Sequence, residues 1–383
     1  MDLKKELPAI FENFSEARRN GFITAKTLKD NNIPLVGTFC TYMPQEIVMA
    51  AGAVVVSLCS TSDETIGEAE IDLPRNLCPL IKSSYGFGKT DKCPYFYFAD
   101  LIVGETTCDG KKKMYEYLGD FKDVHVMQLP NTQIGEKSYE LWKDEVIKLK
   151  NIIEKKFALQ ITEEQIKEAI KLKNRERVAL KNFYTLGQLN PPAISGTDIL
   201  KVVYGATFKF DKEISIKELE NITEKVKIEY EEGKRLDSKP RILITGCPIG
   251  GASEKVVKAI EDNGAYVVAY ENCTVSKANE LLVDQNKNVY DALAEKYLAI
   301  GCSCMSPNLN RIDLLEKMIE EYKVDGVVDV VLQACHTYAV ETLSIKRFVR
   351  GKHRIPYMAV ETDYSQSDVG QLNTRMAAFV EML

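Results

Sequence analysis

Short apolar runs alternate with amphipathic stretches in the first third of the chain. Runs rich in β-branched and other apolar residues, typical of buried strands, lie at 33–39, 53–58, 99–104 and 123–129. The stretches between them, such as 44–52 and 111–119, carry apolar residues at helical spacing. Apolar strands separated by helices predict a parallel sheet that is covered by helices on both faces.

The last third of the chain repeats this pattern. Strands are predicted at 241–246, 265–270, 325–333 and 355–361. A helix is predicted between the first two of them, at 252–264. We therefore expect one α/β architecture to occur twice, as two Rossmann-like or flavodoxin-like lobes.

Long charged amphipathic runs separate the two α/β regions. Thr162, followed by Glu164 and Gln165, is typical of a helix start, and residues 190–192 (Asn-Pro-Pro) interrupt the helical pattern. The abundant Lys and Glu residues here are most simply a solvated face. The expected domains are a first lobe at 1–134, a helical connecting segment at 135–235 and a second lobe at 236–383.

Composition excludes several classes of protein. The 383 residues are 45% hydrophobic and 28% charged, which argues against a chain that is disordered throughout. A net charge of -6 argues against nucleic acid as a partner. The most apolar run, Ile47 to Cys59, falls short of the ~20 residues that a membrane-spanning helix needs. With no signal peptide recognised at the N-terminus, we expect a cytoplasmic protein.

The chain contains ten cysteines and three histidines. In a reducing compartment, clustered cysteines more often bind metal or carry out redox chemistry than form disulfides. The sequence lacks Walker A, G-x-S-x-G, His-Glu-x-x-His and Cys-x-x-Cys patterns, and TGCPIGGASEK does not fit the dinucleotide-binding glycine pattern. Widely spaced cysteines favour an iron–sulfur cluster as the metal group.

Six cysteines closely follow predicted strands: Cys40, Cys59, Cys108, Cys247, Cys273 and Cys335. Ligands bind beyond the carboxyl ends of strands in open parallel sheets, so we expect these cysteines to converge on a thiolate-rich cleft between the lobes. The alternative for any one of them is simple packing in the core, most plausibly for Cys59 and Cys247. Cys93 follows no strand and is interpreted as structural or incidental.

Several cysteines have more informative neighbours. Cys108 precedes a predicted helix start and three lysines, which would stabilise a thiolate. Cys335 precedes His336, which we expect near the cluster as a hydrogen-bond donor to sulfur or a proton source, rather than as a ligand. The further candidates are Cys40, before Tyr42 and Glu46; Cys78, between Pro74 and Pro79; and the pair Cys302 and Cys304.

These motifs resemble those of the 2-hydroxyacyl-CoA dehydratase and benzoyl-CoA reductase superfamily. The matching segments fall in order along nearly the whole chain, at 37–53, 108–116, 302–311, 332–342 and 361–381. The resemblance implies two α/β lobes that clasp a cysteine-held iron–sulfur cluster. It also implies an ATP-hydrolysing activator that supplies low-potential electrons, and pairing of two related chains.

The resemblance also implies a set of ligands. A dehydratase subunit would hold one [4Fe-4S] cluster through Cys40, Cys108 and Cys335. The additional Cys78, Cys273 and either Cys302 or Cys304 resemble the branch called double-cubane cluster proteins, in which six cysteines hold two [4Fe-4S] cubanes bridged by sulfide. Which of Cys302 and Cys304 is the sixth ligand is left open.

Three functions remain in competition. The first is a low-potential reductase component that accepts electrons from a separate ATPase and reduces a small molecule. The second is a subunit of a 2-hydroxyacyl-CoA dehydratase, in which a free iron site binds the thioester carbonyl. The third is a non-catalytic electron carrier. The sequence names neither the substrate nor a coenzyme A site, and because one chain holds every expected ligand we expect a homodimer.

Overall fold

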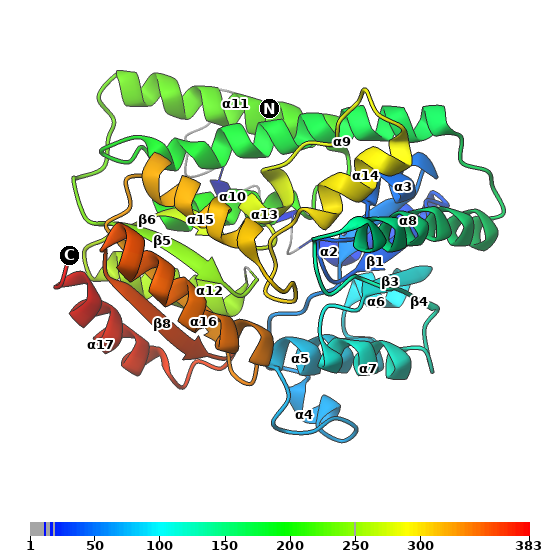
Figure 1. The fold of residues 1–383 in the computed structure, drawn as a ribbon, viewed down its shortest axis with the longest axis horizontal. Coiled ribbons are helices and arrows are strands. Elements are labelled where there is room, and N and C mark those ends of the chain that lie inside the picture. The colour runs from blue at the N-terminus through cyan, green and yellow to red at the C-terminus, as the bar shows by residue number, and fades with distance from the viewer. Residues whose placement is uncertain (1–10, 13–15, 18–19, 249) are drawn as a thin grey trace. The chain divides into compact units, whose positions relative to one another are not determined.

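The computed structural model describes residues 11–12, 16–17, 20–248 and 250–383 (Figure 1). The chain divides into two compact units. The N-terminal unit comprises 20–177 and 281–308, and the C-terminal unit comprises 178–280 and 309–383 with the described residues before position 19. The expected helical segment 135–235 is therefore shared between the units. Residues 281–308, expected in the second lobe, contribute to the N-terminal unit.

The N-terminal unit contains a four-stranded sheet and the helices around it. Its strands are β1 (Leu35–Thr38), β2 (Val54–Ser57), β3 (Leu101–Glu105) and β4 (Val124–Met127). Its helices are α2 (Gly21–Asp30), α3 (Gln45–Ala50), α4 (Ile66–Ala69), α5 (Pro79–Lys89), α6 (Pro94–Phe98), α7 (Asp109–Leu118), α8 (Glu136–Phe157), the larger part of α9 (Glu163–Tyr184) and α14 (Val289–Leu298). All four predicted strands are confirmed. They pair in parallel in the order β2-β1-β3-β4.

The C-terminal unit has the same plan. Its strands are β5 (Arg241–Gly246), β6 (Tyr266–Glu271), β7 (Gly326–Leu332) and β8 (Tyr357–Thr362). Its helical elements, besides the end of α9, are η1 (Thr185–Gln188), α10 (Gly196–Ala206), α11 (Lys212–Glu231), α12 (Gly251–Asp262), α13 (Ser276–Asn279), α15 (Leu309–Glu321), α16 (His336–Phe348), the π-helical turn η2 (Val349–His353) and α17 (Val369–Val380). The sheet order is β6-β5-β7-β8, again all parallel.

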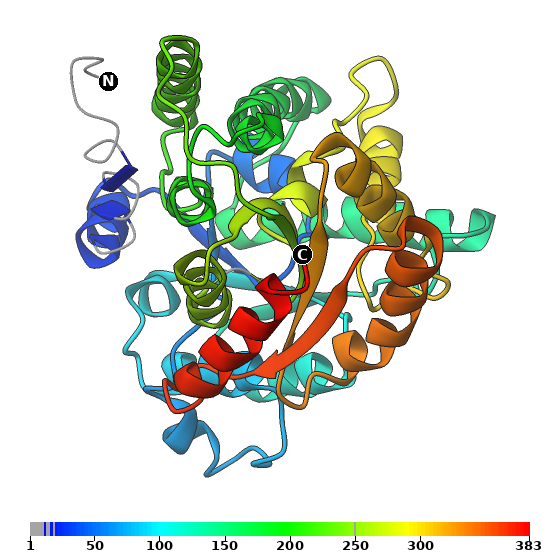
Figure 2. The same cartoon turned by 90° about the vertical axis from the view of Figure 1, so that its left-hand side faces the viewer.

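The repeated strand order confirms that one α/β architecture occurs twice. Each sheet runs second, first, third, fourth strand, which is the order of flavodoxin-like doubly wound folds. In the C-terminal unit α12 and α17 pack together on one face of the sheet, and α15 and α16 lie on the other (Figure 2). The predicted sheet with helices on both faces is therefore present.

Burial explains why the apolar runs form these strands. The central strands β1, β3, β5 and β7 are buried along their whole length, whereas the edge strands are buried only in part. Continuous apolar runs suit strands that are covered on both faces. In the N-terminal unit the core continues beneath α8 and α14 and includes the fully buried Trp142.

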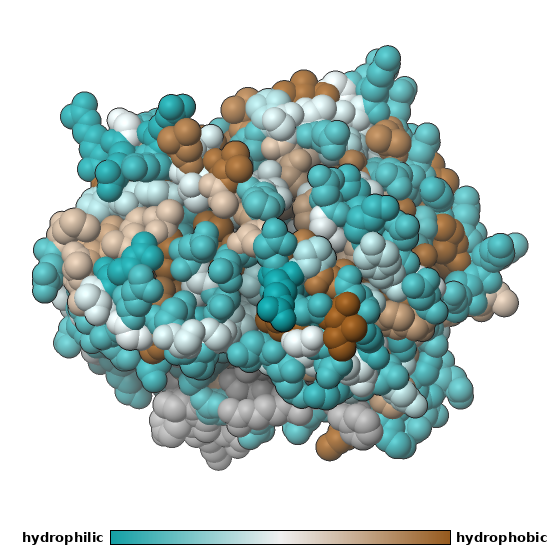
Figure 3. Space-filling view, turned by 90° about the horizontal axis from the view of Figure 1, so that it is seen from below, coloured by the Kyte–Doolittle hydropathy of each residue, from teal (hydrophilic) through white to brown (hydrophobic). Residues whose placement is uncertain are grey.

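The helical segment also follows its sequence pattern. The Gln165 amide hydrogen donates to Thr162 Oγ1 at 3.2 Å, and the Thr162 amide hydrogen donates to Gln165 Oε1 at 2.8 Å, which is a reciprocal capping box. The predicted interruption at 190–192 lies between η1 and α10. Polar side chains cover most of the face seen in Figure 3, with apolar ones in small groups. Among the described residues, no helix is long and apolar enough to cross a bilayer.

Candidate functional site

Each sheet has a topological switch point between its first and third strands. The connections from these neighbouring strands leave in opposite directions, which opens a crevice at their carboxyl ends. In the N-terminal unit Cys40 follows β1 and Cys108 follows β3. In the C-terminal unit Cys247 follows β5 and Cys335 follows β7. The predicted placement of cysteines at strand ends is confirmed, and they flank the switch point in both units.

Cys40 lies against a buried lysine. Lys111 Nζ donates a hydrogen bond to Cys40 Sγ at 2.8 Å, and Thr107 Oγ1 lies 3.7 Å from the same sulfur. Lys111 is only 6% exposed. Burial alone lowers the pKa of Lys111, but the neighbouring Cys40 sulfur, with Tyr115, raises it well above its usual value. Of the three lysines expected to stabilise a thiolate, this one contacts a candidate ligand.

A buried carboxyl group adjoins Cys40 and Lys111. Glu105 ends β3, is fully buried, and accepts a hydrogen bond from the Met43 amide on Oε1 at 2.8 Å. Burial raises the pKa of Glu105 to about 7, although the charge of Lys111 acts in the opposite direction. The sequence interpretation missed this residue. Glu105 could have been recognised in the sequence as an acidic residue at the end of an otherwise apolar strand. A charge at such a buried position is costly unless it is paired.

Cys302 and Cys304 reach the same region from residues 281–308. Cys304 Sγ lies 3.9 Å from the hydroxyl of Tyr42, which in turn donates to the Ile300 carbonyl at 2.8 Å. A hydrogen bond to Cys302 raises the pKa of Cys304 well above its usual range, and burial and the nearby Cys40 sulfur act in the same direction. The fold therefore brings the Cys-x-Cys pair close to Cys40, as expected for a shared site.

Cys78 and Cys108 both occupy helix N-cap positions, of α5 and α7 respectively. A Cβ atom added at Gly110, in the first turn of α7, would lie 2.7 Å from Ile81 in α5. The starts of the two helices therefore adjoin. Helix N-termini favour negative charge, which suits thiolate ligands at both caps.

Cys59 and Cys93 have surroundings that fit a structural role. Cys59 Sγ donates to the Phe39 carbonyl at 2.7 Å, and burial raises its pKa. Cys93 is the N-cap residue of α6, and burial also raises its pKa.

The C-terminal unit holds a second group of thiols at its strand ends. Burial raises the pKa of Cys247 to about 12, and the nearby Cys335 and Cys273 also raise it. Gly246, which precedes Cys247, has a φ of +107°, and a Cβ there would lie 2.2 Å from the Val330 carbonyl oxygen. Cys335 is the N-cap of α16, and His336 follows it as an exposed first residue of that helix.

A buried network of charges lies beneath these strand ends. The Arg311 guanidinium donates to Thr245 Oγ1 at 2.7 Å and to Glu271 Oε2 at 3.2 Å, and it pairs with Glu341. Lys277 Nζ lies 2.9 Å from Glu271 Oε1. Glu271 is thus engaged in a buried ion network.

Tyr338 connects this network to Cys273. Lys277 Nζ donates to the Tyr338 hydroxyl at 3.1 Å, and that hydroxyl lies 4.0 Å from Cys273 Sγ. The Lys277 ammonium and the Arg311 guanidinium each lie 5.1 Å from the centre of the Tyr338 ring. The sequence interpretation missed this arrangement, because it joins residues from β6, α13, α15 and α16.

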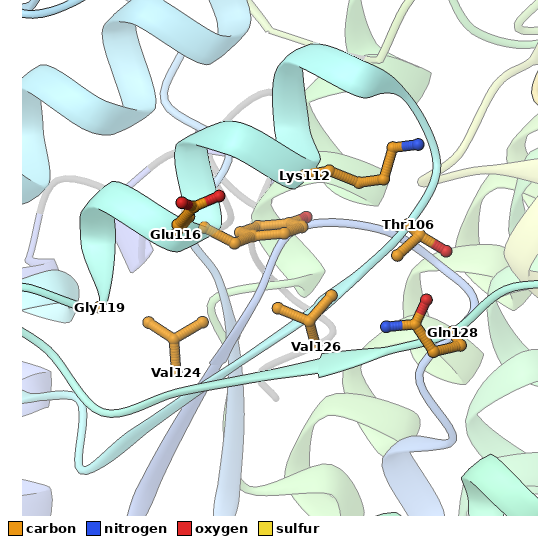
Figure 4. A pocket seen from close by; sticks show the side chains of 8 residues that line it. Thr106, Lys112, Glu116, Gly119, Val124, Val126 and Gln128 are labelled. Atoms are coloured by element: carbon orange, nitrogen blue, oxygen red, sulfur yellow. The ribbon is translucent and has the colours of Figure 1, made fainter.

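A groove of about 420 Å³ runs along α7 beside the edge strand β4 (Figure 4). Its lining residues are Thr106, Lys112, Tyr115, Glu116, Gly119, Val124, Val126 and Gln128. Figure 4 shows Lys112 extending from the helix on the side of α7 that borders this groove. Lys111 and Lys112 therefore have different surroundings although they are consecutive.

The donor atoms at the strand ends bear on whether an iron–sulfur group fits here. Within the described ranges, no three His, Cys, Asp or Glu side chains are already arranged to hold a single metal ion. The chemical type of the donors fits nonetheless, because thiols predominate at the strand ends and a buried lysine and two helix N-termini accompany them. These residues therefore fit an iron–sulfur group by the chemical type of their donor atoms.

Comparisons with known proteins identify a family for this chain. The sequence profile of the family described as 2-hydroxyglutaryl-CoA dehydratase, D-component, matches residues 40–383. The chain belongs to this family. The superfamily inferred from the sequence motifs is thereby confirmed.

Relatives within the family are named as enzyme subunits. An Escherichia coli (strain K12) protein named provisionally as the dehydratase subunit YjiM is 70% identical over 383 residues, 100% of both chains. The (R)-phenyllactyl-CoA dehydratase beta subunit of Clostridium sporogenes is 24% identical over 366 residues, 94% of each chain. The (R)-2-hydroxyglutaryl-CoA dehydratase subunit beta of Acidaminococcus fermentans is 21% identical over 98% of this chain and 100% of its own.

Proposed function

We propose that this chain is an iron–sulfur reductase component that accepts low-potential electrons from a separate ATP-hydrolysing activator and reduces a small molecule. The observation that supports it most is the gathering of Cys40, Cys302 and Cys304 at the switch point of one sheet, with Cys108 capping α7 at the next strand end. This surplus over the three ligands of a dehydratase subunit favours two bridged [4Fe-4S] cubanes. The cysteines proposed to hold them are Cys40, Cys78, Cys108, Cys273, Cys335 and one of Cys302 and Cys304.

When bound, such a group supplies single electrons at low potential. The protein residues have separate roles. Lys111 donates a hydrogen bond to Cys40 sulfur, and the caps of α5 and α7 stabilise negative charge on Cys78 and Cys108. The buried aromatic residues Phe39 and Tyr115 pack together beside Lys111, with ring centroids 5.4 Å apart. His336, exposed at the start of α16, stays a prediction as a proton source.

A second candidate function is a subunit of a 2-hydroxyacyl-CoA dehydratase with one [4Fe-4S] cluster. It is favoured by the two relatives named as dehydratase beta subunits, which match this chain over almost its whole length. The two functions differ in iron content. They also differ in the cysteines that hold iron, because the single cluster would need Cys40, Cys108 and Cys335 alone.

The experiment is an iron and acid-labile sulfide count on protein purified without oxygen. Two cubanes predict about eight irons per chain, and one cubane predicts about four. A reproducible value near four would refute the double-cubane proposal and favour the dehydratase subunit. Zinc in place of iron would refute both.

Cysteine replacements then test the ligand set. Cys108→Ser and Cys335→Ser exchange a soft thiolate for a harder and less readily ionised oxygen, so both should lose iron and visible absorption. Cys93→Ser and Cys59→Ser are the controls, because Cys93 follows no strand and Cys59 Sγ already donates to the Phe39 carbonyl, so both variants should leave the iron content nearly unchanged. Equal iron in all four variants would show that the strand-end argument is wrong.

A further inference from the structure

Three consecutive lysines open α7, and the helix gives them different surroundings. Lys111 is 6% exposed and directed to Cys40, whereas the side chain of Lys112 is 47% exposed and that of Lys113 is 68% exposed. Lys112 pairs with Asp109 at 2.6 Å, and Lys113 pairs with Glu116 at 2.7 Å. Successive helical residues are rotated by about 100° from one another, so only one of the three turns toward the strand ends.

Lys111 is hydrogen-bonded to a thiol, and the buried carboxyl group of Glu105 lies nearby without forming an ion pair with it. Its Nζ lies 2.8 Å from Cys40 Sγ and 5.8 Å from the centre of the Phe39 ring. Among the described residues, no Asp or Glu forms an ion pair with it. A buried ammonium is costly unless a partner compensates its charge, and negative charge on Cys40 sulfur would compensate it.

We propose that Lys111 is a positioning residue that holds the sulfur of Cys40 through an N–H···S hydrogen bond and makes the cluster bound by Cys40 easier to reduce. This inference rests on the proposed function. A cluster gains negative charge when it accepts an electron, and a fixed cation with a hydrogen bond to a ligand sulfur stabilises that reduced form. Because the site is buried, the electrostatic effect is larger than at a solvent-exposed position.

The test compares the iron-loaded parent protein with Lys111→Met, Lys111→Arg and Lys112→Met. Lys112→Met is the matched control, because it removes the same charge from the next residue of the same helix at an exposed, ion-paired position. Iron and sulfide are counted first. The reduction midpoint is then measured by electron paramagnetic resonance during a redox titration.

The Lys111→Met protein should be at least about tenfold harder to reduce, which is about 59 mV for a one-electron step. Lys112→Met should keep the parent midpoint, since solvent and salt screen its charge. Lys111→Arg retains a cation and N–H donors and should restore a midpoint close to that of the parent.

An unchanged midpoint in Lys111→Met, or an equal shift in Lys112→Met, would overturn the inference and leave the proposed function standing. If Lys111→Met holds no iron, the reduction midpoint of Lys111→Arg tests the inference instead. A parental midpoint in that variant supports the role, and a shift of tenfold or more overturns it. A parent protein that contains no iron would overturn the proposed function and this inference together.

Discussion

Replacing Glu105 by glutamine should change how stability depends on pH. Glu105 is fully buried at the end of β3, its Oε1 accepts from the Met43 amide, and its Oε2 has no hydrogen-bond partner. Burial raises the pKa of this carboxyl from 4.5 to about 7. The pKa of Glu105 is higher in the folded protein than in the unfolded protein, so protonation of this carboxyl favours the folded state. Its contribution to the free energy of unfolding is fully present below the unfolded pKa and is lost as the pH rises through about 7.

The magnitude follows from the difference between the two pKa values. Each pH unit between them corresponds to about 1.36 kcal/mol, so ionising Glu105 in the folded protein costs about 3 kcal/mol at a pH well above 7. Glutamine cannot ionise and keeps an acceptor for the Met43 amide. Any packing cost of its NH₂ group is the same at every pH. The gap in stability between Glu105→Gln and the parent should therefore grow by about 2–3 kcal/mol between about pH 5 and about pH 8.

The assay is thermal unfolding of the metal-free proteins at these two pH values. For a unit of this size about 1 kcal/mol corresponds to roughly 2–4 °C, so the Tm of Glu105→Gln should gain roughly 5–10 °C on the parent between about pH 5 and about pH 8. Glu116→Gln is the control, because Glu116 is an exposed residue of α7 that pairs with Lys113. The reasoning is refuted if Glu105→Gln and Glu116→Gln track the parent equally at both pH values.

Two further predictions concern the C-terminal unit and the assembly. Arg311→Met leaves Glu271 and Asp329 buried without their guanidinium partner and should cost about 3–5 kcal/mol in urea unfolding. Lys352→Met, at a largely exposed ion pair with Glu316 in the same unit, should cost less than about 1 kcal/mol. Equal losses would contradict the role given to the Arg311 network. In analytical ultracentrifugation the chain expressed alone should sediment as a homodimer, because it carries all the proposed ligands itself, and a strict monomer would count against this assembly.

The sequence by itself determined the elements of the fold. All eight apolar runs form the predicted strands, because a strand that is buried on both faces needs an apolar residue at nearly every position. The position of a strand's end is also local information, so the placement of Cys40, Cys108, Cys247 and Cys335 just beyond strands was predictable. The motifs around these cysteines were enough to identify the family, and the family profile confirms it.

Other features of the site depend on contacts between distant parts of the chain. The return of residues 281–308 to the N-terminal unit brings Cys302 and Cys304 close to Cys40, and no local pattern marks that return. The sequence gives three equivalent lysines, but the rotation of α7 and its packing direct only Lys111 to Cys40.

The charges of the buried residues were likewise decided by tertiary structure. Glu105 and Arg311 read as ordinary charged residues in the sequence, and burial makes one an acid with a pKa near 7 and the other the centre of an ion network. The spacing of apolar residues reflects interactions between near neighbours, so it can be recognised in the sequence. Burial and charge pairing depend on which distant segments meet, so only the folded structure decides them.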